Sequence, residues 1–428
     1  MGKALIMAAA NDGDNVANAT FYSLGCFLNE NAVEANRSVY FGKAGTLSKM
    51  GCNVDATGGS RSLTTRKNVA NGNQVITIAD AASGIQEDLV NTDSVSVADL
   101  IAVAVAETGT NPTFYWVRYI FEATANHATI FANCSATSFL TDSVTRYGPL
   151  GGQVKLLATI GDAQCTMRAP GTLSRLSVVV TSNTRITNST IGLDIGGSAG
   201  NNIVTITAGV TGVFTDTTNS DTISDGTLAC FYATNSTGGG TLAWQLINCT
   251  FENTTNNKND VIATGNTTRA ASATVHYLPI GGSNRFDVTT ESQAAVTHGF
   301  AGTISRLRMN LSANTYTVAA TVRLRKNTGD GNQVLTLTAS TTGLFEDTTN
   351  TDTFISTDTI NLSIVGGTSG NITAQWWAVT EEETAAPPGG GITSTTNLHA
   401  ISSGAATPNA VASLHPITSG IHGLKEAA

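Results

Sequence analysis

Charged side chains are scarce in this sequence. Asp, Glu, Lys and Arg together make up 12% of the 428 residues, about half of the roughly 25% that is usual in soluble proteins. The 22 Lys and Arg residues form no basic run, and the formal net charge is −9. Little in the chain would therefore attract a phosphate backbone, and we expect no nucleic-acid partner.

Long apolar runs are missing as well. No stretch approaches the roughly 18 consecutive apolar residues of a transmembrane helix, and the short apolar segment Met1–Ala10 leads directly into Asn11-Asp12-Gly13-Asp14. We expect neither a membrane partner nor a signal peptide. A cellular surface protein would need an export signal, whereas a virion protein assembles in the host cytoplasm and leaves by lysis. This expectation favours a virion.

The six cysteines form no CxxC pair and show no regular spacing. Neither a zinc site nor a redox motif is predicted from them, and buried free thiols are expected. Cys230 and Cys249 fall on successive predicted strands of one repeat, so a disulfide between them is the alternative.

Thr, Asn, Ser, Ala and Gly are abundant, with 43 glycines. This composition is typical of an all-β protein with many turns. Hydrophobic residues make up 41% of the chain, which is too many for a disordered chain, so the chain should fold.

One pattern occurs three times. The first part of the pattern, called the Gly-Thr mark, reads Gly45-Thr-Leu-Ser-Lys49, Gly171-Thr-Leu-Ser-Arg175 and Gly302-Thr-Ile-Ser-Arg306. The second copy starts 126 residues after the first, and the third starts 131 residues after the second. This spacing is typical of whole sandwich domains. A lead-in precedes this mark at Tyr22–Gly25, Tyr147–Gly152 and Tyr277–Gly282.

A second set of marks follows in register. These marks begin at Gly84, Gly212 and Gly343, and each leads through an aspartate to an Asn-x-Asp triplet. A strand with alternating apolar and polar residues precedes each mark, after a turn at Asn71–Asn73, Gly200–Asn202 or Gly329–Gly331. We interpret this as a β-hairpin that is repeated three times.

The fold class that follows is all-β, with three tandem jelly-roll-like β-sandwich repeats and a non-globular C-terminal arm. The aromatic residues of the closing strands, which include Trp116, Trp244, Trp376 and Trp377, are expected to fill the sandwich cores. The predicted division is an N-terminal arm at 1–20, repeats at 21–140, 141–268 and 269–384, and a Pro-Gly linker with an extended arm at 385–428.

The C-terminal arm contains a short pattern twice, and this pattern is similar to the domain lead-in. The similarity suggests a single β-strand that belongs to no domain of its own. Such a strand could add to a sheet edge of a neighbouring subunit; the alternative is a disordered end. The predicted assembly residues of this arm are Leu398, His399, Ile401, Leu414, His415 and Ile417.

Two kinds of chemical site were considered. Gly196–Gly200 fits the Gly-x-Ser-x-Gly pattern of serine hydrolases, but its position at a hairpin favours a glycine-rich turn, and we expect no catalytic residue and no organic cofactor. The repeated acidic turns offer the oxygen ligands that calcium prefers, although such residues also cap turns. The calcium hypothesis concerns Asp88, Asn91, Asp93, Asp216, Asn219, Asp221, Asp347, Asn350 and Asp352.

The repeated pattern of Gly-Thr-Leu-Ser-Arg, Asn-Gly-x-Gln-Val-x-Thr-Ile, Gly-x-Phe-x-Asp and Asn-x-Asp resembles β-sandwich modules of structural proteins of tailed-phage virions. The resemblance covers residues from roughly 20 to 384. It implies a decoration, head-fibre or tail-associated role, and no catalytic residues.

These observations predict a non-enzymatic structural protein of a phage-like virion exterior. Three similar domains can imitate a trimer and present three similar faces to a lattice. Expected partners are other virion structural proteins and copies of the chain itself. The alternatives are a glycan-binding fibre or adhesin that contacts a host surface glycan and, third, a cellular surface-layer or filament protein.

Overall fold

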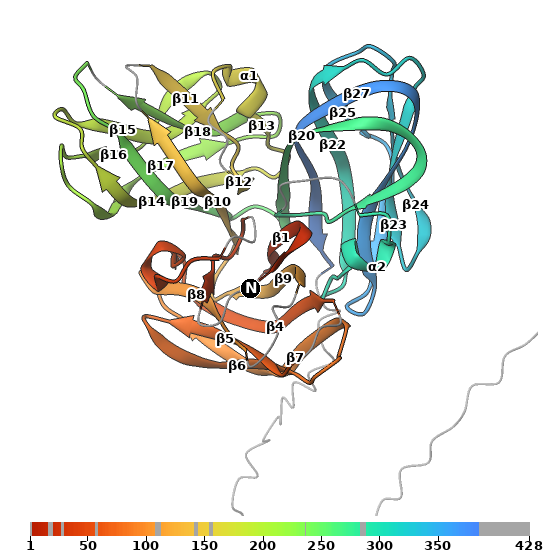
Figure 1. Ribbon diagram of the computed structural model, residues 1–428, viewed down its shortest axis with the longest axis horizontal. Coiled ribbons are helices and arrows are strands. Elements are labelled where there is room, and N and C mark those ends of the chain that lie inside the picture. Colours follow the sequence, from red (N-terminus) through yellow and green to blue (C-terminus); the bar gives the residue numbers. More distant parts are fainter. Residues whose placement is uncertain are drawn as a thin grey trace, which may run out of the picture. The chain divides into compact units, whose positions relative to one another are not determined.

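The predicted all-β architecture is confirmed in the computed structural model (Figure 1). The structure describes residues 2–15, 20–26, 30–55, 59–107, 113–140, 144–153, 157–235, 237–282 and 288–384. Within these ranges almost every element is a strand, and the helical turns are η1 (Glu34–Asn36), α1 (Ile160–Ala163) and α2 (Glu291–Ala294). No helix in this part of the chain is both long and apolar enough to span a membrane.

The first set of strands forms two sheets around one apolar core. The first sheet has the order β1 (Lys3–Asn15), β9 (Thr113–Ala123), β4 (Gly45–Val54) and β7 (Gly84–Val95). The second sheet has the order β2 (Thr20–Tyr22), β8 (Leu100–Glu107), β5 (Arg61–Lys67) and β6 (Ala70–Ile78), with β3 (Val39–Tyr40) also paired to β8.

The second set repeats this plan. Its first sheet has the order β12 (Gly152–Gln153), β10 (His127–Leu140), β19 (Leu242–Asn253), β14 (Gly171–Asn183) and β17 (Gly212–Ile223). Its second sheet has the order β11 (Thr145–Gly148), β18 (Leu228–Asn235), β15 (Ser189–Ile195) and β16 (Ser198–Ile206), with β13 (Cys165–Thr166) paired to β18.

In the third set two long strands, β20 and β27, each run through both sheets. The late part of β27 pairs with β22 and its early part pairs with β23. The strands of this set are β20 (Lys258–Leu278), β21 (Val296–Thr297), β22 (Gly302–Asn314), β23 (Ala320–Lys326), β24 (Gly329–Leu337), β25 (Gly343–Glu346), β26 (Thr351–Phe354) and β27 (Thr359–Glu383).

The strands pair in one order in all three sets. When the eight main strands of a set are numbered along the chain, the first sheet reads 1-8-3-6 and the second 2-7-4-5. A long antiparallel hairpin that rolls up into two sheets gives this order, which is that of a jelly roll. We interpret the sets as three copies of one unit, sandwich 1 (2–124), sandwich 2 (126–253) and sandwich 3 (257–384).

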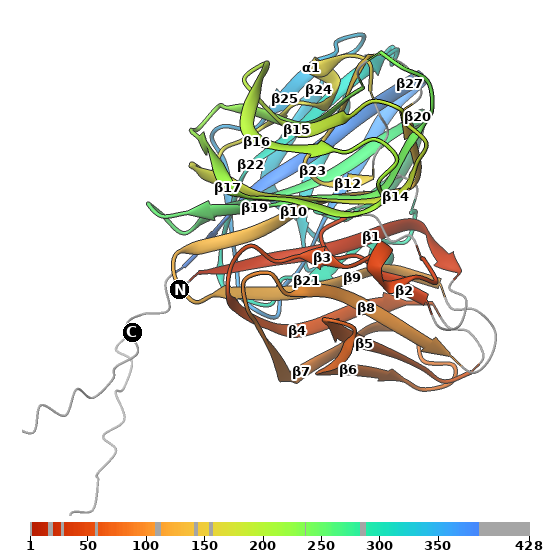
Figure 2. The ribbon, with the colours of Figure 1, turned by 90° about the vertical axis from the view of Figure 1, so that its left-hand side faces the viewer.

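Strand pairing places the start of each unit earlier than the sequence predicted. The segment expected as an arm, 1–20, contains β1, which pairs with β9. Likewise β10 pairs with β19, as Figure 2 shows, and the first half of β20 pairs with β27. The repeated marks all lie in strands 3 to 6, so they give the spacing of the units without showing where each begins.

The Gly-Thr-Leu-Ser mark encodes a β-bulge in strand 3. Its last residue has a left-handed backbone, with φ of 52°, 57° and 56° for Lys49, Arg175 and Arg306, and the register of the strand shifts there. A bulge leaves the next backbone N–H unpaired in the ladder. The buried Gln74 side chain accepts that N–H from Met50 at 3.0 Å, and Gln333 does the same for Leu307 at 2.8 Å.

The three predicted hairpins are present, but their turns lie nearer the N-terminus than expected. The turn residues have positive φ and are Asn68–Val69, Gly196–Gly197 and Asn327–Thr328. The segments predicted as turns, 71–73, 200–202 and 329–331, lie inside β6, β16 and β24. Glycine is required there for close approach, because a Cβ at Gly72 would lie 2.7 Å from a carboxylate oxygen of Asp93.

The three lead-in segments bring the first strands of the sandwiches together. The glycine that ends each lead-in packs against the first strand of the following sandwich, and the one that ends the third returns to β1. A Cβ at Gly151 would lie 2.7 Å from the carbonyl of Ile262, and one at Gly281 would lie 2.9 Å from the Met7 side chain. The cavity enclosed by these segments is only about 20 Å³, which is room for about one water molecule.

Two of the tryptophans do not lie where the sequence predicted. Trp377 and Trp244 pack in the cores of sandwiches 3 and 2, as expected. Trp116 instead packs into the core cluster of sandwich 3, and Trp376 into that of sandwich 2. Both are on the outer face of a first sheet, so they fill contacts between sandwiches.

Candidate functional site

The outer face of each first sheet is covered by a segment of another sandwich, and these contacts contain buried polar and apolar residues. Each covering segment contains one helical turn and one short strand: 34–43 in sandwich 1, 160–169 in sandwich 2 and 291–300 in sandwich 3. Sandwich 1 is covered by sandwich 3, sandwich 2 by sandwich 1, and sandwich 3 by sandwich 2. One type of contact thus closes a ring of three.

The contact between sandwiches 1 and 3 is centred on Trp116. Its ring nitrogen donates to the carbonyl of Ala295 at 3.1 Å, next to helix α2. At the edge, Lys3 forms an ion pair with Glu383 at 3.0 Å. Deeper in the contact Glu381 is fully buried, accepts the backbone N–H of Leu5 at 3.1 Å and lies 3.1 Å from the His298 ring.

The contact between sandwiches 3 and 2 contains a buried ion pair. Arg308 and Asp260 have no exposed side-chain surface and their charged atoms are 2.8 Å apart. Arg308 also donates to the carbonyl of Thr166 at 2.8 Å. The second oxygen of Asp260 accepts the backbone N–H groups of Arg168 and Ala169 at 2.8 and 3.1 Å. The carboxylate therefore holds the covering segment in place.

The contact between sandwiches 2 and 1 uses neutral polar groups instead of a buried ion pair. The Asn248 side chain donates to the carbonyl of Tyr40 at 2.8 Å and accepts its N–H at 3.4 Å. Gly42 donates its N–H to Thr250 at 3.1 Å. The salt bridge between Lys43 and Glu252, at 2.7 Å, lies at the edge of this contact.

The residues of the calcium hypothesis form a clamp between the free edges of the two sheets. Asp88 on β7 accepts N–H groups from Val75, Val90 and Asn91, and Asp93 accepts those of Asn73 and Gln74 on β6. The same contacts recur around Asp216 and Asp221 and around Asp347 and Asp352.

Calcium would have to displace these donors, so the geometry favours the structural role of the acidic turns. Among the residues that the structure describes, no three His, Cys, Asp or Glu side chains are grouped so that they could hold a metal ion. The calcium hypothesis stays a prediction without geometric support.

The clamp lowers the pKa of its first carboxyl group in each sandwich, that of Asp88, Asp216 or Asp347. Burial by itself would raise their pKa values, but the accepted hydrogen bonds stabilise the charged form and outweigh it. The pKa of Asp216 falls to about 2, and the pKa values of Asp88 and Asp347 are lowered in the same way.

Other predicted sites are placed as follows. Ser198 of the Gly-x-Ser-x-Gly match is exposed and directly follows the two-residue turn between β15 and β16, where it pairs with Ile195. The six cysteines are buried and free, so Cys230 and Cys249 are not bridged. The assembly arm, with Leu398, His399, Ile401, Leu414, His415 and Ile417, lies outside the described residues.

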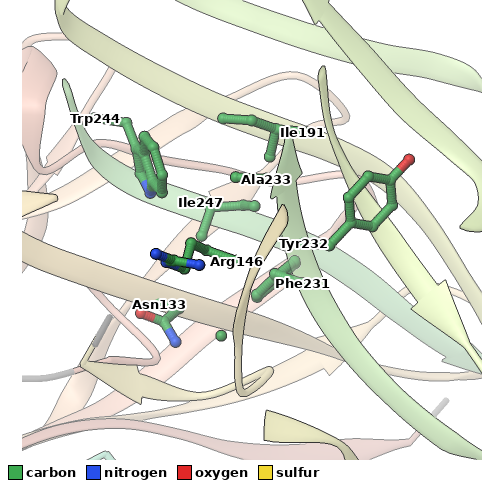
Figure 3. Close-up of a pocket in the computed structure, with 9 residues that line it drawn as sticks. Asn133, Arg146, Ile191, Phe231, Tyr232, Ala233, Trp244 and Ile247 are labelled. Atoms are coloured by element: carbon green, nitrogen blue, oxygen red, sulfur yellow. The ribbon is translucent and has the colours of Figure 1, made fainter. Parts of the chain in front are cut away.

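Sandwich 2 contains a small pocket between its sheets (Figure 3). Ile191, Phe231 and Ala233 of the second sheet and Trp244 and Ile247 of the first sheet line it. Its volume is about 10 Å³, which is no more than one water molecule needs. It is a packing defect of the core and too small for an organic ligand.

Sequence reasoning missed the polar residues of the contacts, such as Arg118, Arg308 and Asp260. A signal for the contacts was present, because Phe114–Phe121 is an almost unbroken apolar run and its residues are all buried. A strand with one solvated face would alternate instead, so an unbroken run indicates a sheet covered on both sides.

Comparison with known proteins identifies no relative. No protein-family model matches the chain, and no curated protein matches it. The function is therefore inferred from the geometry.

We predict that Asp216→Asn lowers the free energy of unfolding by about 2 kcal/mol at pH 7, because an amide group would face N–H donors. A carboxyl with a lowered folded-state pKa stabilises the protein above its unfolded pKa of about 4. That contribution is lost as the pH falls towards 2, so the variant and the wild type should converge there. Urea unfolding at several pH values measures the difference.

The control is Asp225→Asn, because the Asp225 side chain is 55% exposed and makes one ion pair with Arg168. Its effect should stay below about 1 kcal/mol. A pH-independent loss for Asp216→Asn would contradict the role given to its charge.

We predict that Asp260→Asn destabilises the protein by about 3 to 5 kcal/mol, because it leaves the guanidinium of Arg308 buried without its counter-charge. Adding Arg308→Met should restore part of the loss, as a double-mutant cycle would measure. Lys258→Met is the control, since Lys258 and Glu382 are 3.7 Å apart and 38% and 46% exposed, and it should cost less than about 1 kcal/mol. Equal losses for Asp260→Asn and Lys258→Met would refute the assignment.

Proposed function

We propose that the chain is a non-enzymatic structural protein on the exterior of a phage-like virion, of the capsid decoration, cement or fibre type. The observation that carries the proposal is the ring of three like contacts inside one chain. Head-to-tail contacts that close after three units give a threefold arrangement, and here the three units are covalently linked. Such a chain acts as a preformed trimer.

A preformed trimer has a physical advantage in a lattice. Three separate subunits must lose translational and rotational freedom to assemble, whereas linked units have lost most of it already. The chain can therefore occupy a threefold or quasi-threefold position of a particle as one rigid piece. Its partners in this role are other virion proteins and further copies of itself.

The surface composition supports the same role. The edge strands of the second sheets, β6, β16 and β24, expose mainly small or polar residues, and Val75 on β6 is the one large apolar side chain that they expose. The Asp clamps described above fix these edges against the neighbouring strands. Edges of this kind resist uncontrolled strand pairing, so controlled assembly falls to the sandwich faces and to the terminal arm.

Immunogold electron microscopy of purified particles tests the location. We expect gold on the outer surface of intact particles. Gold label on the surface of uninfected cells, or secretion of the protein by such cells, would favour a cellular surface protein and would refute the virion assignment.

Deletion of residues 392–428 tests the arm. The melting temperature of the truncated chain should equal that of the full chain, because the last strand that the structure describes, β27, ends at Glu383. Incorporation into particles, measured by quantitative immunoblotting of purified virions, should fall at least tenfold. Normal incorporation of the truncated chain would remove the arm from the proposal.

A further inference from the structure

The three contacts between sandwiches also differ at the next-to-last residue of each covering segment. Three residues before each Gly-Thr mark the chain has Gly42, Arg168 or Gly299. In the contact between sandwiches 2 and 3, the Arg168 side chain forms ion pairs with Glu346 and, at 2.8 Å, with Asp225. The guanidinium fills the space between the two sandwiches there.

The matching place between sandwiches 1 and 3 has lost both members of the second ion pair. Gly299 stands where Arg168 stands, and Ser356 stands where Asp225 stands, nine residues after the clamp aspartate in each case. A cavity of about 450 Å³ opens there. This volume falls within the roughly 300 to 1,000 Å³ of small-molecule sites.

The charges around this cavity do not balance. Lys49 and Arg118 line it together with a single carboxylate, that of Glu87. Arg118 has no exposed side-chain surface, pairs with Glu87 and donates to the carbonyl of Lys49 at 2.7 Å. Its Nε–H has no partner within the described residues. Among the described residues that line the cavity, one positive charge is therefore left without a counter-ion.

The state of Lys49 agrees with this excess of positive charge. Burial lowers the pKa of Lys49, and the neighbouring charge of Arg118 lowers it further. Its ammonium group donates to the carbonyl of Gly299, which leaves two of its three N–H donors for a ligand.

The remaining walls combine two kinds of surface. Ile85 and Leu89 form an apolar side, and the Leu89 side chain is 60% exposed although it is large and apolar. Thr297, Ser356 and Thr357, whose side chains carry hydroxyl groups, line the cavity from sandwich 3. An apolar wall together with hydroxyl groups suits a sugar ring, which has C–H faces and a rim of hydroxyl groups.

We propose that this cavity, between Lys49 and Arg118 of sandwich 1 and Gly299 and Ser356 of sandwich 3, binds a carboxylated monosaccharide unit. The carboxylate supplies the missing counter-charge. The ring lies against Ile85 and Leu89. The proposal does not depend on the virion assignment, because the cavity is a property of the folded chain alone.

Isothermal titration calorimetry with D-glucuronate, and with D-glucose as the uncharged control, tests the site on the full chain. The wild type should bind glucuronate at least tenfold more tightly than glucose. Lys49→Gln should weaken glucuronate binding at least tenfold, because it removes a charge and keeps a side chain of similar length. Thr357→Trp, at an exposed turn position, should block binding by filling the cavity.

Arg306→Gln is the matched control. Arg306 is the last residue of the same mark in sandwich 3, next to the contact that Arg168 fills, so its loss should change glucuronate binding less than twofold. Melting temperatures within a few degrees of the wild type would show that the variants are folded. Absence of glucuronate binding, equal binding of glucose, or equal effects of Lys49→Gln and Arg306→Gln would overturn the proposal.

Discussion

A sheet that is apolar on both faces must be covered on both faces, and this requirement organises the molecule. In β9 the eight residues from Phe114 to Phe121 are all buried, and a solvated outer face would expose several of them to water. Each sandwich covers the inner face of its first sheet by its own second sheet, and another sandwich covers the outer face. Because each unit both needs a covering segment and supplies one, the contacts run head to tail. Closure after three units leaves none of these faces bare.

The polar groups in the contacts determine which unit meets which. Burying Arg308 or Glu381 costs stability unless a partner is placed to meet it. The central polar pair is an ion pair of Arg308 with Asp260 in one contact and an amide of Asn248 with the backbone of Tyr40 in another. The side-chain pairs that cross from a covering segment to its neighbour, Lys43 with Glu252 and Arg168 with Glu346, have no counterpart in the other covering segments, so an exchanged segment would leave the two glutamates unpaired. We infer that these pairs fix the order of the three sandwiches.

Local patterns predicted local structure well and long-range structure incompletely. The all-β class and the three hairpins follow from alternation and from the repeated marks. The hairpin turns were misplaced because Gly72 looks like a turn residue, whereas it is small to admit the carboxylate of Asp93 from another strand. The early start of each unit was missed because β1, β10 and β20 carry no repeated mark. Pairs such as Arg308 with Asp260 are 48 residues apart and have no local signature.

Linking three units in one chain has a consequence that a trimer of identical subunits cannot have. In such a trimer every contact contains the same residues, so a change in one is a change in all three. Here Arg168 bridges one contact through an ion pair with Glu346, while the corresponding residue of another contact, Gly299, lines a cavity. Covalent linkage therefore permits one of the three contacts to acquire a binding cavity while the residues of the other two contacts stay unchanged.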